Sequence, residues 1–314
     1  MTNPRVELSI IAPLFNEEEV LPLFLKEVIR VCESTQKEYE IILVDDGSRD
    51  NTFKIADDVS QTNKKIKVIK FSRNFGHQPA FGAGLDLSQG DLVVTMDGDL
   101  QHPPRLILEF IKQAESGSDI VIGERISNKQ NSAIREFAGR AFYKFLSTIT
   151  NLEFRNVSDF ALYKRPVVLA LKSLPERERF LRGLVQWVGY KKAYVPYVVE
   201  NRKAGSPKYT AKKLFGLIMS GVTSFSAFPL RSAFWVGLLV FIFSIGFSGY
   251  VVWDHYANPS PFLVGWATLV ILVLFLGSIQ LMVLGVVGEY LYKMFNEVKG
   301  RPTYIIAETR NIDR

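Results

Sequence analysis

Short apolar runs alternate with helical patterns over the first 125 residues of the chain. Apolar, partly β-branched runs of the kind found in buried strands lie at Leu8–Leu14, Ile41–Val44, Ile66–Phe71, Leu92–Met96 and Ile120–Gly123. Between them, apolar residues recur every three or four positions, which is the period of an amphipathic helix. The helical segments are expected at Val20–Val28, Gln78–Leu87 and from Pro103 to Ser116. This alternation predicts an α/β fold with a mostly parallel sheet that carries helices on both faces.

Two later segments have a helical period with large apolar residues. Ser132–Thr150 repeats such residues, with Arg135, Arg140 and Lys144 among the remaining positions. Two interpretations stay open: an ordinary helix packed on the sheet, or a helix at a membrane surface with its cations toward lipid phosphates. Ala211–Phe225 has a similar pattern and is expected to lead the chain into a bilayer.

The C-terminal third contains two long stretches without charge. Ser232–Trp253 has no charged residue across 22 positions, and Tyr256–Gly288 has none across 33. Because roughly 20 apolar residues cross a hydrocarbon core, two transmembrane helices are predicted. The loop Asp254–Pro261 has no Lys or Arg, whereas both outer flanks are basic, at Lys208, Lys212, Lys213, Arg231, Lys293, Lys299 and Arg301. The positive-inside rule therefore places both flanks and the globular part in the cytoplasm.

The composition limits the classes of ligand that this chain is expected to bind. The 314 residues carry a net charge of +6 with a hydrophobic content of 47%, and the basic residues form no single long tract. This excludes a nucleic-acid-binding arm and favours lipid and phosphate ligands. Cys32 is the only cysteine, so no intramolecular disulfide can form, as expected in a reducing compartment. Met1–Glu7 lacks the apolar core of a signal peptide.

Two carboxylates follow the fourth apolar run. Asp97 and Asp99 are separated by Gly98, and residues two apart at a strand end point the same way. Oxygen ligands of this kind suit Mg²⁺ or Mn²⁺, which one or two carboxylates and a substrate phosphate can hold. Gly98 is expected to let a ligand approach the backbone. The alternative is an acidic turn with no ligand.

Polar residues also follow other predicted strands. Asn16, Asp46 and Arg125 occupy such positions, as Asp97 and Asp99 do. In sheets of this class, ligands bind beyond the carboxyl ends of the strands. The sequence therefore predicts one site at this edge of the sheet.

Several motifs in fixed order resemble those of family 2 glycosyltransferases, which have the nucleotide-diphospho-sugar transferase fold of the GT-A type. They are Pro13–Glu18, Val44–Ser48, Ser72–His77 and Met96–Gln101. Three further motifs resemble polyprenyl-phosphate glycosyltransferases, which are related to dolichyl-phosphate mannose synthases: Ser158–Phe160, Arg179–Gly183 and Asn201–Tyr209. The two C-terminal spans resemble bacterial members that glucosylate undecaprenyl phosphate for O-antigen or cell-wall modification.

The resemblance implies a donor site built from several motifs. The nucleoside pocket would contain Pro13, Leu14, Asn16, Glu17 and Asp46. The metal ligands would be Asp97, Asp99 and Gln101, with Asp97 also near the sugar and Arg125 near the donor. The donor diphosphate would meet Arg202, Lys208 and Tyr209, of which Arg202 and Lys208 would stabilise the departing charge.

The acceptor side is implied in the same way. Arg135, with Arg140 as second choice, would hold the acceptor phosphate, and Gly139 stands where related proteins have a serine. Asp159 matches the position usually assigned as the catalytic base. A phosphate monoester is mostly dianionic at neutral pH, however, so Asp159 could instead orient the sugar or the acceptor.

The resemblance thus implies an inverting enzyme that moves glucose from UDP-glucose onto undecaprenyl phosphate at the cytoplasmic leaflet of the bacterial inner membrane. Mg²⁺ or Mn²⁺ would be the cofactor, and the partners would be donor, polyprenyl phosphate and lipid bilayer, without nucleic acid. A homo-oligomer, suspected to be a tetramer, is also suggested.

Three alternatives stay open. One is a mannosyltransferase that uses GDP-mannose, which the residues do not exclude. A processive polysaccharide synthase would have a Gln-x-x-Arg-Trp motif and more spans, whereas Gln186 directly precedes Trp187 here. A nonenzymatic membrane scaffold is disfavoured by the intact set of acids and cations.

Four regions are expected along the chain. They are a nucleotide-sugar-binding half at 1–130, an acceptor-binding half at 131–228, a two-helix transmembrane region at 229–290 and a cytoplasmic tail at 291–314.

Overall fold

The structure, a computed structural model, describes residues 5–126, 157–176, 181–198, 228–257 and 265–312. The chain divides into two compact units. The first, here called the sheet unit, comprises Met1–Thr210 and Pro302–Arg314, and the second, the helix-pair unit, comprises Ala211–Arg301. The two predicted amphipathic segments, 132–150 and 211–225, lie outside the described residues.

The sheet unit contains an eight-stranded sheet with the order β7-β5-β6-β4-β1-β2-β3-β8. The strands are β1 Leu8–Leu14, β2 Tyr39–Asp45, β3 Ile66–Phe71, β4 Leu92–Thr95, β5 Ile120–Ile126, β6 Val157–Lys164, β7 Lys192–Val198 and β8 Ile306–Arg310. The first five were predicted from their apolar runs, whereas β6, β7 and β8 were not. The four pairings β1–β2, β1–β4, β2–β3 and β5–β7 are parallel.

Two antiparallel pairings put β6 between β4 and β5. The amino end of β6 therefore lies at the same edge of the sheet as the carboxyl ends of β1, β2, β4 and β5. This edge gathers residues from five strands, and the described site residues at these strand ends lie along it, namely Asn16, Asp46, Asp97, Arg125 and Asp159.

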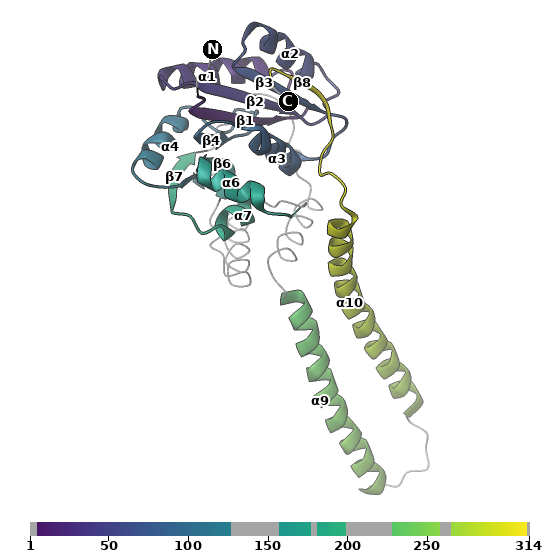
Figure 1. Cartoon of the computed structure of the whole chain (residues 1–314). Coiled ribbons are helices and arrows are strands. Elements are labelled where there is room, and N and C mark those ends of the chain that lie inside the picture. Colours follow the sequence, from purple (N-terminus) through teal and green to yellow (C-terminus); the bar gives the residue numbers. More distant parts are fainter. Residues whose placement is uncertain (1–4, 127–156, 177–180, 199–227, 258–264, 313–314) are drawn as a thin grey trace. The chain divides into compact units, whose positions relative to one another are not determined.

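Helices cover both faces, which confirms the predicted fold class. Buried residues of α1 (Leu21–Ser34), α2 (Thr52–Thr62) and α4 (Leu106–Glu115) form one core with one face of the sheet. The opposite face carries α3 (His77–Leu87), α6 (Arg165–Ser173) and α7 (Leu181–Trp187). Figure 1 shows α1 and α2 on one side of the sheet and α3 and α6 on the other.

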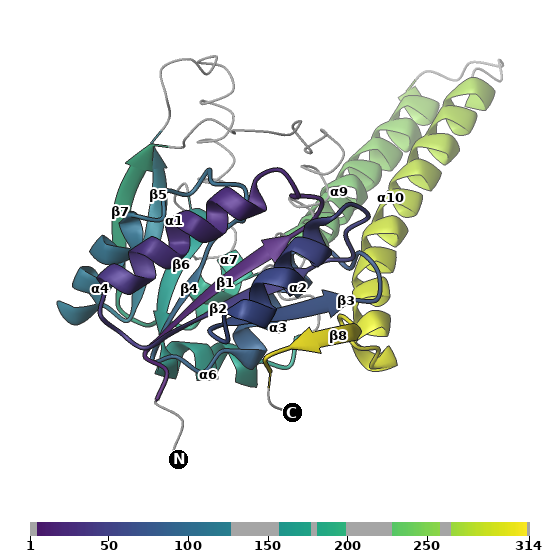
Figure 2. The same ribbon diagram turned by 90° about the horizontal axis from the view of Figure 1, so that it is seen from above.

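The last strand comes from the far end of the sequence. β8 pairs antiparallel with β3 and covers what would otherwise be an open edge of the sheet. In Figure 2, β8 lies alongside β3. The segment that was expected to be a tail thus contributes a strand to the sheet unit.

The helix-pair unit consists of two long apolar helices, α9 (Phe228–Ala257) and α10 (Gly265–Lys299). Each contains a window of at least 18 residues that is apolar enough to cross a membrane, at Leu230–Phe247 and Phe275–Lys299. Most of the described side chains in these windows are solvent-exposed apolar groups, as lipid contact requires. The second helix continues past Gly288, where the uncharged stretch ends, into a polar final turn at Lys299.

Candidate active site

Asp97, just beyond the carboxyl end of β4, is a carboxylate that two histidines contact. Its Oδ1 lies 2.7 Å from Nε2 of His77, and its Oδ2 lies 3.6 Å from Nε2 of His102. Burial by itself would raise the pKa of Asp97, but the N–H group of His102 that faces it, the hydrogen bond with His77 and the positive charge of Arg125 outweigh this and hold the pKa well below its usual range. Asp97 is therefore ionised at neutral pH.

His102 is a buried, neutral ring. The backbone N–H of Asp97 donates to its Nδ1 at 3.0 Å, so the ring hydrogen sits on Nε2 and faces the Asp97 carboxylate. The ring is stacked on Phe160 with centroids 5.0 Å apart. Burial lowers the pKa of His102, although the neighbouring carboxylate opposes this. His102 thus holds the backbone of Asp97 by one hydrogen bond, whereas its Nε2 makes no hydrogen bond to any described group.

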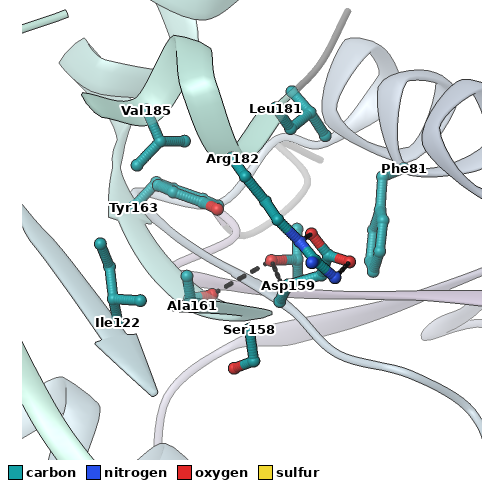
Figure 3. A pocket seen from close by; sticks show the side chains of 10 residues that line it. Phe81, Ile122, Ser158, Asp159, Ala161, Tyr163, Leu181, Arg182 and Val185 are labelled. Atoms are coloured by element: carbon teal, nitrogen blue, oxygen red, sulfur yellow. Dashed lines mark hydrogen bonds and ion pairs between the residues drawn. The ribbon is translucent and has the colours of Figure 1, made fainter. Parts of the chain in front are cut away.

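Asp159, near the amino end of β6, forms a bidentate ion pair with Arg182 of α7. The guanidinium Nε and Nη2 donate to its two carboxylate oxygens at 2.8 and 2.6 Å. The residue is 8% exposed, and Figure 3 shows Arg182 reaching from its helix to this carboxylate. Burial would raise the pKa of Asp159, but Arg182 outweighs it and lowers the pKa. A carboxylate held in this way is a weak proton acceptor.

A small cavity adjoins this ion pair. It measures about 10 Å³ and is lined by side chains that include Phe81, Tyr163 and Val185 (Figure 3). That is roughly the space that one water molecule requires. The cavity cannot hold a sugar, so a substrate would have to lie elsewhere along the site edge.

His77 joins the two carboxylates. Its Nε2 meets Asp97, and its Nδ1 lies 3.9 Å from Oδ2 of Asp159. Burial lowers the pKa of His77, but the hydrogen bond to Asp97 and the attraction of both carboxylates outweigh it, so the pKa is raised. The side chain is still 40% exposed, so this ring is within reach of a ligand.

Asp46, after β2, organises the loop that carries His77. Its Oδ1 and Oδ2 accept the backbone N–H groups of Phe75 and Gly76 at 2.7 and 2.9 Å. Gly47 follows with a φ of +69°, and a Cβ added there would lie 2.5 Å from the backbone carbon of Arg73. Only glycine allows the two loops to pack so closely. The role of Asp46 as a nucleoside ligand stays a prediction, and its visible role is to hold this loop.

The residues after β1 form a second loop contact. Asn16 has a φ of +54°, and its side-chain oxygen accepts the backbone N–H of Arg49 at 2.9 Å. The backbone N–H of Glu17 donates to Thr52 at 2.8 Å. Pro13 and Leu14 are buried within β1. Their predicted place in a nucleoside pocket remains untested, although Asn16 and Glu17 lie at the predicted edge.

Gly98 has a packing role that the sequence did not indicate. A Cβ at this position would lie 2.5 Å from Cδ2 of Leu14 and 3.3 Å from the carbonyl oxygen of Pro13. The glycine therefore lets the Asp97–Asp99 turn pack tightly on β1. The expectation that it lets a ligand approach the backbone stays a prediction.

Comparison with known proteins identifies the family. Residues 9–170 match the family described as "Glycosyl transferase family 2". The chain belongs to glycosyl transferase family 2. It is 38% identical over 304 residues to an uncharacterized glycosyltransferase of Synechocystis, across 96% of this chain and 95% of that protein. It is 37% identical over 305 residues to the SfII prophage-derived bactoprenol glucosyl transferase of Shigella flexneri, across 97% and 98%.

A solved structure confirms the fold of this family 2 member. Glucosyl-3-phosphoglycerate synthase from Mycobacterium tuberculosis, solved with Mn²⁺, UDP and phosphoglyceric acid, superposes with a TM-score of 0.51. The alignment covers 69% of this chain and 76% of that chain at 18% identity. At this identity the likeness establishes a shared GT-A type fold and nothing more.

The donor set of this glycosyltransferase fits a divalent cation that is completed by a phosphate. The described residues contain no cluster of three or more His, Cys, Asp or Glu side chains that could hold a metal ion. Asp97 is nevertheless ionised. Asp99 follows it in a tight turn, in which Leu100 has a φ of +59° and the backbone N–H of Gln101 donates to the Asp99 carboxylate at 3.1 Å. Two carboxylates suffice where a diphosphate supplies further oxygens.

Arg125 is held in place by β7. Its Nε donates to the hydroxyl of Tyr197 at 3.2 Å, and its charge acts on Asp97. The structure thus brings Asp46, Asp97, Arg125 and Asp159 into one network. Five other predicted residues lie outside the described part of the chain: Arg135, Arg140, Arg202, Lys208 and Tyr209.

Three residues of this network received no role from the sequence. His77 ends the Ser72–His77 motif and Arg182 lies in Arg179–Gly183, so the motifs contained them without indicating which side chain they meet. His102 follows the Met96–Gln101 motif directly. The position of His102 directly after an acidic motif is a signal that could have identified it, whereas no acidic motif adjoins His77 or Arg182 in the sequence.

Proposed function

We propose that this chain is a polyprenyl-phosphate glucosyltransferase, which moves glucose from UDP-glucose onto undecaprenyl phosphate at the cytoplasmic leaflet. The observation that carries the proposal is the similarity to bactoprenol glucosyl transferases over nearly the whole length of both chains, including the apolar helices. Bactoprenol is an undecaprenol, so a phosphorylated form of that lipid is the corresponding acceptor.

The two long helices support a lipid acceptor. An enzyme anchored by α9 and α10 needs to reach only the phosphate of a prenyl chain that stays in the bilayer. A soluble enzyme would have to extract that chain, at about 0.8 kcal/mol per CH₂ group. The basic flanks of both helices support the cytoplasmic side that we propose for the globular part.

The proposed reaction is a single inverting displacement. An oxygen of the acceptor phosphate forms a bond to the anomeric carbon, and the bond from that carbon to the nucleoside diphosphate breaks. The acceptor oxygen needs no proton removal, because the second pKa of a phosphate monoester is about 6. Asp159, tied to Arg182, would orient the groups at the reacting carbon instead of acting as a base.

The negative charge of the departing nucleoside diphosphate would be neutralised by groups at the donor site. Asp97, Asp99 and Gln101 would hold Mg²⁺ or Mn²⁺, which when bound would offset charge on the diphosphate. Arg202 and Lys208 would add positive charge there. Catalysis would then rest on positioning and electrostatics, without a covalent intermediate.

A transfer assay tests this proposal. The full-length protein in membranes is incubated with a labelled sugar donor, a short polyprenyl phosphate and Mg²⁺ or Mn²⁺, and the lipid product is extracted. UDP-glucose is expected to label the lipid, EDTA to abolish the labelling and either cation to restore it. Labelling from GDP-mannose alone would establish the mannosyltransferase alternative, and donor hydrolysis without lipid product would rule out a polyprenyl acceptor.

A further inference from the structure

The C-terminal segment Pro302–Arg310 belongs to the sheet unit although it follows both long helices in sequence. At its start, the carbonyl oxygen of Ile305 accepts the backbone N–H of Ser72 at 3.0 Å. The ring of Tyr304 stacks on Phe71, with centroids 5.0 Å apart and planes at 12°. The hydroxyl of Tyr304 donates to Oδ2 of Asp86 at 3.2 Å.

These contacts reach the strand before one loop and the last turn of the helix after it. Phe71 ends β3, and Asp86 lies in α3, which begins at His77. Tyr304 therefore ties the strand before residues 72–76 to the helix after them. The contacts at Phe71 and Ser72 hold the amino end of this loop, here called the 72–76 loop, whereas Asp86 lies in the last turn of the helix that follows it.

The 72–76 loop in turn holds the carboxylates of the site. Phe71 meets Phe75 edge to face at 5.7 Å, and the N–H groups of Phe75 and Gly76 bind the Asp46 carboxylate. The next residue, His77, contacts Asp97. An unbroken series of contacts thus leads from Tyr304 to Asp46 and Asp97.

We propose that Tyr304 is a positioning residue for the nucleotide-sugar site. It touches neither carboxylate but holds the 72–76 loop in the conformation that presents Asp46 and His77. The proposal rests on the proposed function only in naming the ligand as a nucleoside diphosphate sugar. A consequence is that the donor site is complete only once the chain has continued through both α9 and α10.

Strand β8, which begins two residues after Tyr304, offers a matched control. Arg310, at the far end of β8, donates to Asp57 at 2.7 Å and to Glu308 at 2.9 Å. Neither partner belongs to the 72–76 loop. Arg310→Met therefore weakens the attachment of β8 without removing a contact to that loop.

The test compares Tyr304→Leu, Tyr304→Phe and Arg310→Met in the full-length protein in lipid nanodiscs. Hydrogen exchange of the 72–76 loop, without ligand, is expected to accelerate in Tyr304→Leu alone, because Tyr304→Phe keeps the ring. The KM for UDP-glucose is expected to rise about three- to tenfold in Tyr304→Leu, the range that corresponds to loss of an aromatic pair. The kcat and the KM for the polyprenyl phosphate should not change.

Two results would overturn the proposal. One is exchange of the 72–76 loop in Tyr304→Leu at the wild-type rate, and the other is an equal rise in donor KM in Arg310→Met. A wild-type protein that transfers no glucose would refute the proposed function instead. In that case the exchange comparison would still decide whether Tyr304 holds the loop.

Discussion

Replacing Arg182 by methionine would leave the Asp159 carboxylate buried without its charge partner. The wild-type pair is bidentate, with N–O distances of 2.8 and 2.6 Å. Removal of one partner from a buried ion pair costs about 3–5 kcal/mol in unfolding free energy. The Arg182 side chain is 23% exposed and His77 lies 3.9 Å from Asp159, so we expect a loss near the lower figure.

Thermal unfolding in detergent measures this loss. A destabilisation of about 3 kcal/mol lowers the Tm of a unit of this size by roughly 6–12 °C. Asp159→Asn alone should also destabilise, since it leaves Arg182 without its anionic partner. The double variant Arg182→Met/Asp159→Asn should lose less than the sum of the two single losses, with a coupling of about 2 kcal/mol.

Turnover in the same four proteins separates two roles for Asp159. If the pair acts as one positioning unit, kcat/KM falls in both single variants and falls no further in the double variant. A general base behaves differently, because Arg182 lowers the pKa of Asp159 and its removal raises that pKa. Arg182→Met would then keep or increase kcat near neutral pH while Asp159→Asn abolished it.

Additive losses of stability would refute the energetic part of this reasoning. An active Arg182→Met beside an inactive Asp159→Asn would refute the positioning role. Near-wild-type turnover and donor binding in Asp159→Asn would exclude both roles. The stability measurements must be made near neutral pH, because the pKa of Asp159 is lower in the folded state than in the unfolded chain. The stability that this carboxylate contributes is present above about pH 4 and is lost as the pH falls through its folded-state pKa.

Three further predictions concern the same edge of the sheet. Asp97→Asn should reduce the rate of glucose transfer by at least about 100-fold. Asp91→Asn, an exposed control at the other end of β4, should keep the rate within roughly twofold of the wild type. Equal transfer rates in the two variants would contradict this prediction. Gly47→Ala should cost about 1–3 kcal/mol, because its Cβ would lie 2.5 Å from the Arg73 backbone; an unchanged Tm would be evidence against that packing. In chelator, the stabilisation by His77, whose pKa is raised, should be full below about pH 6.5 and decline as the pH rises through the folded-state pKa. A Tm profile of His77→Gln that parallels the wild type over this range would contradict the last prediction.

Much of the fold could be predicted from local patterns. The apolar runs located β1 to β5, and the long uncharged stretches located α9 and α10, because burial in a parallel sheet or in lipid requires such runs. The local patterns did not predict β6, β7 or β8. β8 is short and carries Glu308 and Arg310, so its strand character depends on pairing with β3 and not on its own composition.

The candidate site divides in the same way. Asp46, Asp97, Asp99 and Arg125 could be placed together because residues after parallel strands share an edge. The partners of these residues could not be inferred, since Arg182 and His77 approach from helices that the sequence does not orient. Asp159 reached the same edge only because β6 runs antiparallel between β4 and β5.

The sequence by itself determined which segments are buried, which are apolar enough for a membrane, and which acids follow the strands, because these properties depend on neighbours within a few residues. Only the tertiary structure decided that Arg182 binds Asp159, that Gly98 serves packing, and that Tyr304 reaches the 72–76 loop. Those contacts join residues that are distant in the chain, and their geometry is fixed by how the strands pair and how helices pack on the sheet. Local periodicity carries no information about either.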